Sequence, residues 1–192
     1  ANDAFKPVTR YFDRITRPEQ IIQSFPAAVQ TMLDPADCGP ACIALSQDIQ
    51  GQTFDYPEEF FKERVHAIRR PRPDEFQIKE AAEKIKSSKN PIIISGGGVF
   101  YSDAMEELSQ FAIKHNIPVT QTVMGYSTMK RDHSHFAGQI GGLGGKNTNT
   151  LAKQTDLAIA VGTKLADFTT GSWANFENEN FKLVSINVSR YD

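Results

Sequence analysis

Short apolar runs alternate with amphipathic stretches through the second half of the chain, over residues 74–192. An apolar run bounded by turn residues is typical of a strand that is buried on both faces, as in a parallel sheet covered by helices. Four such runs are present, and each is followed by a loop rich in Gly, Ser or Thr: 92–94, 117–123, 157–161 and 183–188. This alternation predicts an α/β fold, a Rossmann-like doubly wound parallel sheet in three layers.

Capping residues mark where the helices of this half begin. Asp74 is followed three residues later by Gln77, and Asp103 by Glu106. Both are capping-box pairs, in which two side chains satisfy free backbone N–H groups at a helix start. We therefore expect one helix before the first apolar run and one after it. A further helix is predicted over about 148–154.

The first half of the chain has too few elements to form a domain. Thr16 with Glu19 predicts the start of a helix, 41–45 is typical of a buried strand, and 7–12 is a weaker strand candidate. One helix and two strands cannot bury a core alone. We therefore predict a C-terminal remnant of a preceding domain, a proline-rich linker and a Rossmann-like domain: 1–50, 51–73 and 74–192. The last of these is expected to continue with a further strand beyond Asp192.

If the first 50 residues are such a remnant, their helix lacks part of its natural partners. Its apolar residues, among them Phe25 and Val29, should then form an exposed apolar patch of a kind that soluble monomers rarely show.

The composition is that of an ordinary globular protein, with 40% hydrophobic and 23% charged residues. A formal net charge of −2 gives no field that would attract nucleic acid or an anionic membrane, so neither is an expected partner. No apolar run approaches the roughly 20 residues that span a bilayer, and no signal-peptide pattern opens the chain, so we expect a cytoplasmic location. Cys38 and Cys42 have no second pair, and His133 and His135 have no third ligand, so no metal site is predicted.

Three glycines, Gly96–Gly98, follow the first apolar run, where a dinucleotide-binding loop would stand. The fingerprint G-x-G-x-x-G requires a glycine where Tyr101 stands, and an acidic residue near 120–122, where the sequence is TQT. A second glycine-rich segment, 137–145, departs from the P-loop pattern at Asn147. Two interpretations remain: the glycines form tight turns that bring strand and helix together, or they hold a phosphate at a helix N-terminus.

Several segments, taken in order, resemble the thiamine-diphosphate enzymes. GPACIALSQDIQ followed by the proline-rich linker resembles the end of their pyrimidine-binding domain. SSKNPIIISGGGVFYSDAMEEL, TVMGYSTM, TDLAIAVGTKLADFTTG and LVSINVS resemble their central domain. Within that superfamily, DRITRPEQ, VHAIRRPRPDE and DFTTGSWANF resemble a member that hydrolyses a carbon–carbon bond of a cyclic diketone in myo-inositol breakdown. The resemblance covers nearly the whole chain.

The resemblance implies that function is divided among domains. In such enzymes the catalytic glutamate lies early in the pyrimidine domain, and the ligands of Mg²⁺ and thiamine diphosphate lie in a third domain on a G-D-G…N motif. That motif does not occur in this sequence. We therefore expect a non-catalytic central domain of a thiamine-diphosphate-dependent hydrolase, with no catalytic or metal-binding residue of its own. Its expected partners are the remaining pyrimidine and diphosphate domains of the parent chain, in a homo-oligomer.

In acetolactate synthases, which belong to the same superfamily, the central domain also holds FAD. The positions that match this flavin site by resemblance are Gly96, Gly97, Gly98, Thr122, Gly125, Gly141, Gly144, Gly162 and Lys164. The flavin enzymes usually have an arginine where Lys164 stands, so the match is incomplete. An FAD- or ADP-binding domain is the alternative interpretation. A stand-alone NAD-dependent oxidoreductase is disfavoured by Tyr101 and by the missing ribose-binding acid.

Overall fold

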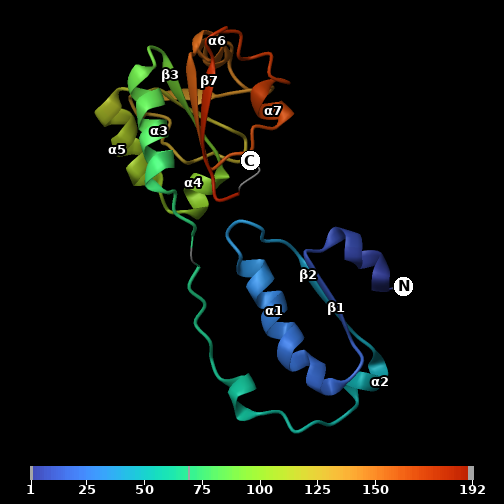
Figure 1. The fold of residues 1–192 in the computed structure, drawn as a ribbon. Coiled ribbons are helices and arrows are strands. Elements are labelled where there is room, and N and C mark those ends of the chain that lie inside the picture. The colour runs from blue at the N-terminus through green and yellow to red at the C-terminus, as the bar shows by residue number, and fades with distance from the viewer. Residues whose placement is uncertain (1, 69, 190–192) are drawn as a thin grey trace. The chain divides into compact units, whose positions relative to one another are not determined.

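The computed structural model describes residues 2–68 and 70–189 (Figure 1). Contacts between Cα atoms divide the chain into two compact units, Ala1–Pro71 and Arg72–Asp192. Among the described residues, none of the helices combines the length and the apolar character that a membrane crossing requires.

The boundary between the units falls inside the linker predicted over 51–73. The predicted limits of the three segments stay predictions. Arg69, in the predicted linker, and residues 190–192, beyond which a further strand is expected, lie outside the described residues.

The first unit is built around a short parallel sheet. In its described part, β1 (Tyr11–Ile15) pairs with β2 (Ala41–Leu45), and α1 (Ile21–Leu33) lies between them in the sequence. The other elements are short: η1 (Asn2–Val8), η2 (Pro18–Gln20), α2 (Gln47–Gln50) and η3 (Glu58–Phe61). The strand predicted at 41–45 is confirmed. The candidate at 7–12 is wrong in position, because strand pairing begins at Tyr11, opposite Ala41, and Pro7 lies in η1.

The side chains that α1 buries are small. Ser24 and Ala28 are each 3% exposed, whereas Phe25 is 52% and Met32 is 50% exposed. Of the residues expected on an exposed apolar patch, Phe25 is exposed and Val29 is half-buried, and the patch itself stays a prediction.

The carboxylate of Asp13 joins β1 to the start of α1. It accepts a hydrogen bond from the hydroxyl of Ser24, and the Gln20 Nε2 group donates to both of its oxygens at 3.1 Å. The Gln20 Oε1 atom accepts the backbone N–H of Thr16 at 3.1 Å. The capping box predicted for Thr16 and Glu19 is therefore wrong, because Gln20 takes the place of the acidic partner.

In the second unit, the described residues form a five-stranded parallel sheet in the order β5-β4-β3-β6-β7. The strands are β3 (Pro91–Ser95), β4 (Val119–Gln121), β5 (Phe136–Gln139), β6 (Leu157–Val161) and β7 (Lys182–Ile186). The helices are α3 (Glu75–Ser87), α4 (Gly97–Tyr101), α5 (Met105–His115), α6 (Lys146–Gln154) and α7 (Asp167–Thr170). The chain passes from β3 to β5 on one side, then returns to place β6 and β7 on the other. This is the strand order of the Rossmann fold, and it confirms the predicted fold class.

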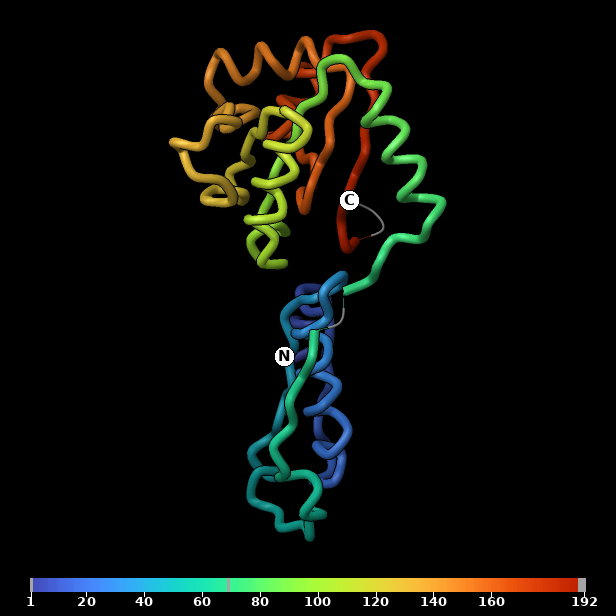
Figure 2. The backbone as a smooth tube through the Cα atoms, turned by 90° about the vertical axis from the view of Figure 1, so that its left-hand side faces the viewer, coloured from blue at the N-terminus to red at the C-terminus, as the bar shows by residue number. Residues whose placement is uncertain are grey.

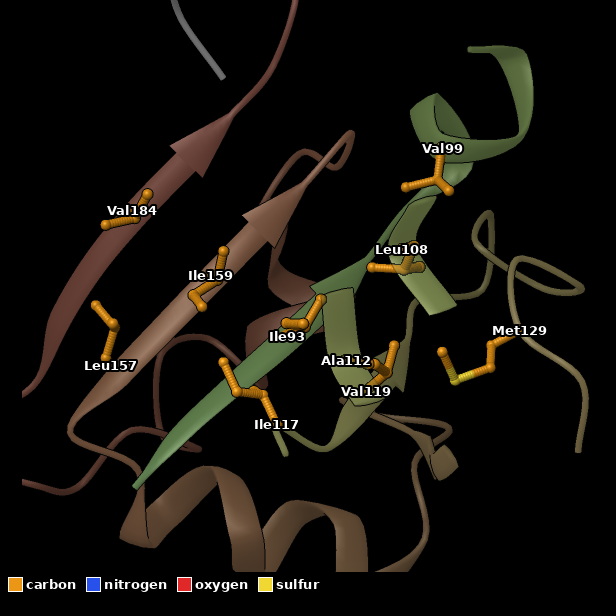
Figure 3. Packing of buried hydrophobic residues seen from close by; sticks show 10 residues of the cluster. All are labelled: Ile93, Val99, Leu108, Ala112, Ile117, Val119, Met129, Leu157, Ile159 and Val184. Carbon is orange, nitrogen blue, oxygen red and sulfur yellow. The ribbon is translucent and has the colours of Figure 1, made fainter. Parts of the chain in front are cut away.

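Helices cover both faces of this sheet (Figure 1). On one face, Ile93 of β3 belongs to the same cluster of buried residues as Leu108 of α5 (Figure 3). Ala81 and Ile85 of α3 pack against that cluster. On the other face, Ile92 and Ile94 pack with Ala152 of α6. Since successive side chains of a strand point to opposite faces, the central strand β3 is buried on both of them, as its apolar run predicts.

Two local predictions differ from the structure near the glycine segments. Asp103 has φ 53°, in the left-handed region, and α5 begins two residues later at Met105. The capping box predicted for Asp103 and Glu106 is therefore wrong, because an extra short helix, α4, precedes α5. The glycine-rich segment 137–145 contains part of β5, which was not predicted. The capping box of Asp74 at the start of α3 is confirmed.

Candidate functional site

All the residues that the resemblance relates to a flavin site lie in loops at the carboxyl ends of the strands. Parallel strands end at the same edge of a sheet, and ligands of such folds bind outside that edge. Gly96–Gly98 follow β3, Thr122 and Gly125 follow β4, Gly141 and Gly144 follow β5, and Gly162 and Lys164 follow β6.

Two of these loops meet between β3 and β6, where the strand order changes direction. The backbone N–H of Gly98 donates to the C=O of Gly162 at 2.8 Å. A Cβ atom on Gly98 would stand 2.6 Å from the Cα of Gly162, and one on Gly96 would stand 2.3 Å from the Gly162 oxygen. Only glycine permits so close an approach of two backbones. Peptide groups therefore occupy the space between these two loops.

Three amide groups around the start of α4, those of Gly96, Gly98 and Val99, already have acceptors within the chain. Gly96 N–H donates to the Val161 oxygen at 2.9 Å, and Val99 N–H donates to the Gly96 oxygen at 3.2 Å. The N–H of Gly98 is engaged by Gly162. A phosphate site at a helix N-terminus requires such N–H groups to point at the ligand. These bonds support the interpretation of the three glycines as a tight connection between strand and helix.

Buried hydroxyl and amide groups hold the loop that follows β4. The Ser95 Oγ donates to Thr128 Oγ1 at 2.6 Å, and Thr128 Oγ1 donates to the Gly125 oxygen at 2.7 Å. The Gln121 Nε2 group donates to the Met129 oxygen at 3.0 Å. Ser95, Gln121 and Thr128 are almost fully buried. Sequence reasoning missed this network, although polar residues directly after two apolar runs are a signal that could have pointed to it.

The loop after β5 is attached to the helices beside it. The Gly141 N–H donates to Asn149 Oδ1 at 3.0 Å, and Asn149 Nδ2 donates back to the Gly141 oxygen at 3.0 Å. The Gly142 N–H donates to the Phe168 oxygen of α7 at 2.8 Å. Gly141 has φ 92°, which favours glycine. This loop is thereby fixed against α6 and α7.

The loop after β6 carries Lys164, whose side chain is exposed. Beside it, the buried Thr163 accepts a hydrogen bond at its backbone oxygen from Asn187 Nδ2 at 3.2 Å. Whether Lys164 and the glycine loops bind a nucleotide stays a prediction.

Ligands for a metal ion do not come together in residues 2–68 and 70–189, where no group of three or more His, Cys, Asp or Glu side chains could hold one. His133 Nε2 lies 3.0 Å from Ser109 Oγ, and His135 Nε2 lies 3.1 Å from Asn116 Oδ1. The Mg²⁺ that accompanies a diphosphate needs oxygen ligands in near-octahedral geometry. The described residues do not fit that group.

The carboxylates with shifted pKa values have ordinary structural partners. Burial disfavours the charged form of Asp156, but hydrogen bonds from the Ser88 hydroxyl and from the N–H groups of Lys89 and Asn90 outweigh it and lower its pKa. In the described residues, each carboxyl group with a shifted pKa has it lowered. A general base is most effective with a pKa near the working pH, so these groups are poorly suited to that role.

Comparison with known proteins agrees with the fold. The sequence profile of the family described as "Thiamine pyrophosphate enzyme, central domain" matches residues 78–192. The 3D-(3,5/4)-trihydroxycyclohexane-1,2-dione hydrolase of Clostridium perfringens (strain 13 / Type A) is 48% identical over 190 residues, which are 99% of this chain and 30% of that protein. The hydrolase of the same name from Bacillus subtilis (strain 168) is 48% identical over 192 residues, which are 98% of this chain and 30% of that protein.

The chain thus spans about 30% of the length of the curated relatives that it matches. The profile covers more than half of the chain and all five strands of the Rossmann-like sheet. This chain therefore belongs to the thiamine pyrophosphate enzyme family and contains its central domain.

Proposed function

We propose that this chain is the non-catalytic central domain, with an adjoining remnant of the pyrimidine-binding domain, of a hydrolase that opens 3D-(3,5/4)-trihydroxycyclohexane-1,2-dione in inositol breakdown. The observation that carries the proposal is the 48% identity to proteins of that name over 99% of the chain. The identity extends well before residue 78, where the family profile begins, so it includes the first unit as well.

In the parent enzyme, thiamine diphosphate would supply the electron sink for breaking a carbon–carbon bond. By the family resemblance, the residues that hold it and its Mg²⁺ lie in other domains of the parent chain. The role of the central domain is then to form a rigid body between those domains. The parent would act in the cytoplasm as a homo-oligomer.

A rigid role is supported by the way in which the strand-end loops bind one another. Gly98 contacts Gly162, the loop after β4 is held by Thr128, and the loop after β5 is held by Asn149. Each of these contacts engages a backbone group of a strand-end loop within the chain itself. The alternative of an FAD- or ADP-binding domain has less support, since the relatives reported above are named as the dione hydrolase and the match at Lys164 is incomplete.

Calorimetric titration with thiamine diphosphate and Mg²⁺ tests whether the cofactor-binding residues lie outside this chain. We expect no binding to the 192-residue chain, and stoichiometric binding to the longer parent protein that contains it. Binding to the 192-residue chain with a Kd below about 10 µM, which corresponds to roughly −7 kcal/mol, would contradict the proposal. The absorbance of the purified parent protein near the flavin bands tests the alternative, because a bound FAD would be coloured.

A further inference from the structure

A cavity in the first unit lies between α1 and the extended segment that follows η3. Both views of the backbone show this segment running beside α1 (Figures 1 and 2). The cavity has a volume of about 210 Å³, and its lining comes from the middle of α1 and from residues 60–66. It belongs to the first unit alone.

The floor of this cavity is apolar. Phe25 and Val29 line it from one face of α1, and the ring of Phe60 lines it from the opposite side. Phe25 is 52% exposed, so about half of its surface remains accessible to a ligand. Covering a water-exposed aromatic ring with an apolar group is favourable, because it removes apolar surface from water.

The other wall of the cavity is basic. Lys62, Arg64 and His66 all line it. Along the chain, these three residues alternate with residues that do not line the cavity. This is expected for an extended segment, in which every second side chain points the same way. The described residues that line the cavity include no carboxylate.

Arg64 is the cation that remains available to a ligand. Lys62 Nζ is paired with Glu59 Oε1 at 2.6 Å, which offsets its charge. Within the described part of the chain, the guanidinium of Arg64 makes no hydrogen bond or ion pair. A guanidinium binds a carboxylate or phosphate through two parallel N–H donors, and it remains charged at all physiological pH values.

We propose that this cavity binds a small organic anion, a carboxylate or phosphate ester with an aromatic or branched aliphatic body. The anionic group pairs with Arg64, and the apolar body lies on Phe25 and Val29 against the ring of Phe60. The volume suits a compact ligand, smaller than the drug-sized molecules that occupy pockets of about 300–1,000 Å³. The proposal does not depend on which reaction the parent enzyme catalyses, but it requires that the surface of Phe25 stays accessible.

The test is a titration of the full 192-residue chain with phenyl phosphate, followed by NMR chemical shifts and calorimetry. Inorganic phosphate, which lacks the apolar body, and phenol, which lacks the charge, are the matched ligands. We expect phenyl phosphate to bind with a sub-millimolar Kd and each of the other two to bind at least about tenfold more weakly, a factor worth about 1.4 kcal/mol. Shifts should be centred on the residues that line the cavity.

Two variants and one control variant separate the contributions of the charge and the apolar surface. Arg64→Gln should weaken phenyl phosphate about tenfold, while Arg17→Gln removes the same charge elsewhere in the unit, at a side chain that is 77% exposed, and should leave the Kd within about twofold. Phe25→Ala should weaken phenyl phosphate but not inorganic phosphate, and its exposed position makes a folding defect easy to avoid. Equal affinity for phenyl phosphate and inorganic phosphate would overturn the proposal. An unchanged Kd for phenyl phosphate in Arg64→Gln would also overturn the proposal. The absence of any binding of phenyl phosphate at ten times the concentration expected to saturate the site would overturn it as well.

Discussion

The backbone N–H of Gly98 donates to the backbone C=O of Gly162 at 2.8 Å, where β3 and β6 end side by side. The two glycines come from loops that are distant in the sequence. Their contact joins the two halves of the sheet at the point where the strand order changes direction.

Gly98→Ala should destabilise the second unit by about 1–3 kcal/mol, the usual cost of forcing an extra carbon into a packed site. The added Cβ would stand 2.6 Å from the Cα of Gly162, and backbone on both sides cannot move away easily. Urea unfolding followed by circular dichroism measures the change. Gly142→Ala is the control, since its Cβ would meet nothing closer than 3.7 Å. Equal urea midpoints for the two variants would show that the approach of the loops does not require glycine.

Asp156→Asn should destabilise the second unit at neutral pH by about 1–2 kcal/mol, because hydrogen bonds to a charged acceptor become bonds to a neutral one. The carboxylate accepts the N–H groups of Lys89 at 2.8 Å and Asn90 at 3.0 Å, and also the hydroxyl of Ser88.

The effect of Asp156 should depend on pH in a defined direction. The folded-state pKa is lowered below its ordinary value, so the stabilisation is complete above the unfolded-state pKa of about 4 and is lost as the pH falls through the folded-state pKa. The free energies of unfolding of the unsubstituted chain and of Asp156→Asn should therefore differ at pH 7 and converge at the lowest pH. A constant difference across that range would rule out ionised Asp156 as the source.

Ser24→Ala should raise the pKa of Asp13 towards its ordinary value. The hydrogen bond from the Ser24 hydroxyl is the largest cause of the lowered pKa, and it acts by stabilising the charged carboxylate. An NMR titration of the Asp13 side-chain carbon measures the change. Thr31→Ala is the control, because the Thr31 hydroxyl bonds to the Ala27 oxygen of its own helix and not to Asp13. If both variants left the titration unchanged, the assigned cause would be wrong.

Thr128→Val should destabilise the second unit by about 1–3 kcal/mol, because it leaves buried polar partners without a hydrogen bond. The Thr128 hydroxyl accepts from Ser95 Oγ and donates to the Gly125 oxygen, and it is 1% exposed. Thr128→Ser keeps the hydroxyl and should recover most of the lost stability. Thermal unfolding compares the two. A stability of Thr128→Val equal to that of the unsubstituted chain would show that the hydroxyl network does not stabilise the unit.

The sequence alone determined which segments of the second unit are buried and how they alternate. The isoleucines of β3 form a continuous apolar run, and only a strand covered on both faces buries them all. The start of α3 was likewise encoded locally, since Asp74 and Gln77 are close enough in the chain to form their capping box without help from the rest of the fold. These features depend on neighbours in the sequence, and a pattern can therefore reveal them.

Tertiary structure decided the features that depend on distant partners. Gly138 has no side chain to show a periodicity, and β5 is defined by its pairing with β4. The small side chains of Ser24 and Ala28, rather than the large one of Phe25, are buried in the first unit, where the Ser24 hydroxyl binds Asp13 of β1. The meeting of the glycine loops after β3 and β6 follows from the strand order, which brings the ends of these two strands side by side. No local pattern contains that order, since it arises from how whole elements cover one another.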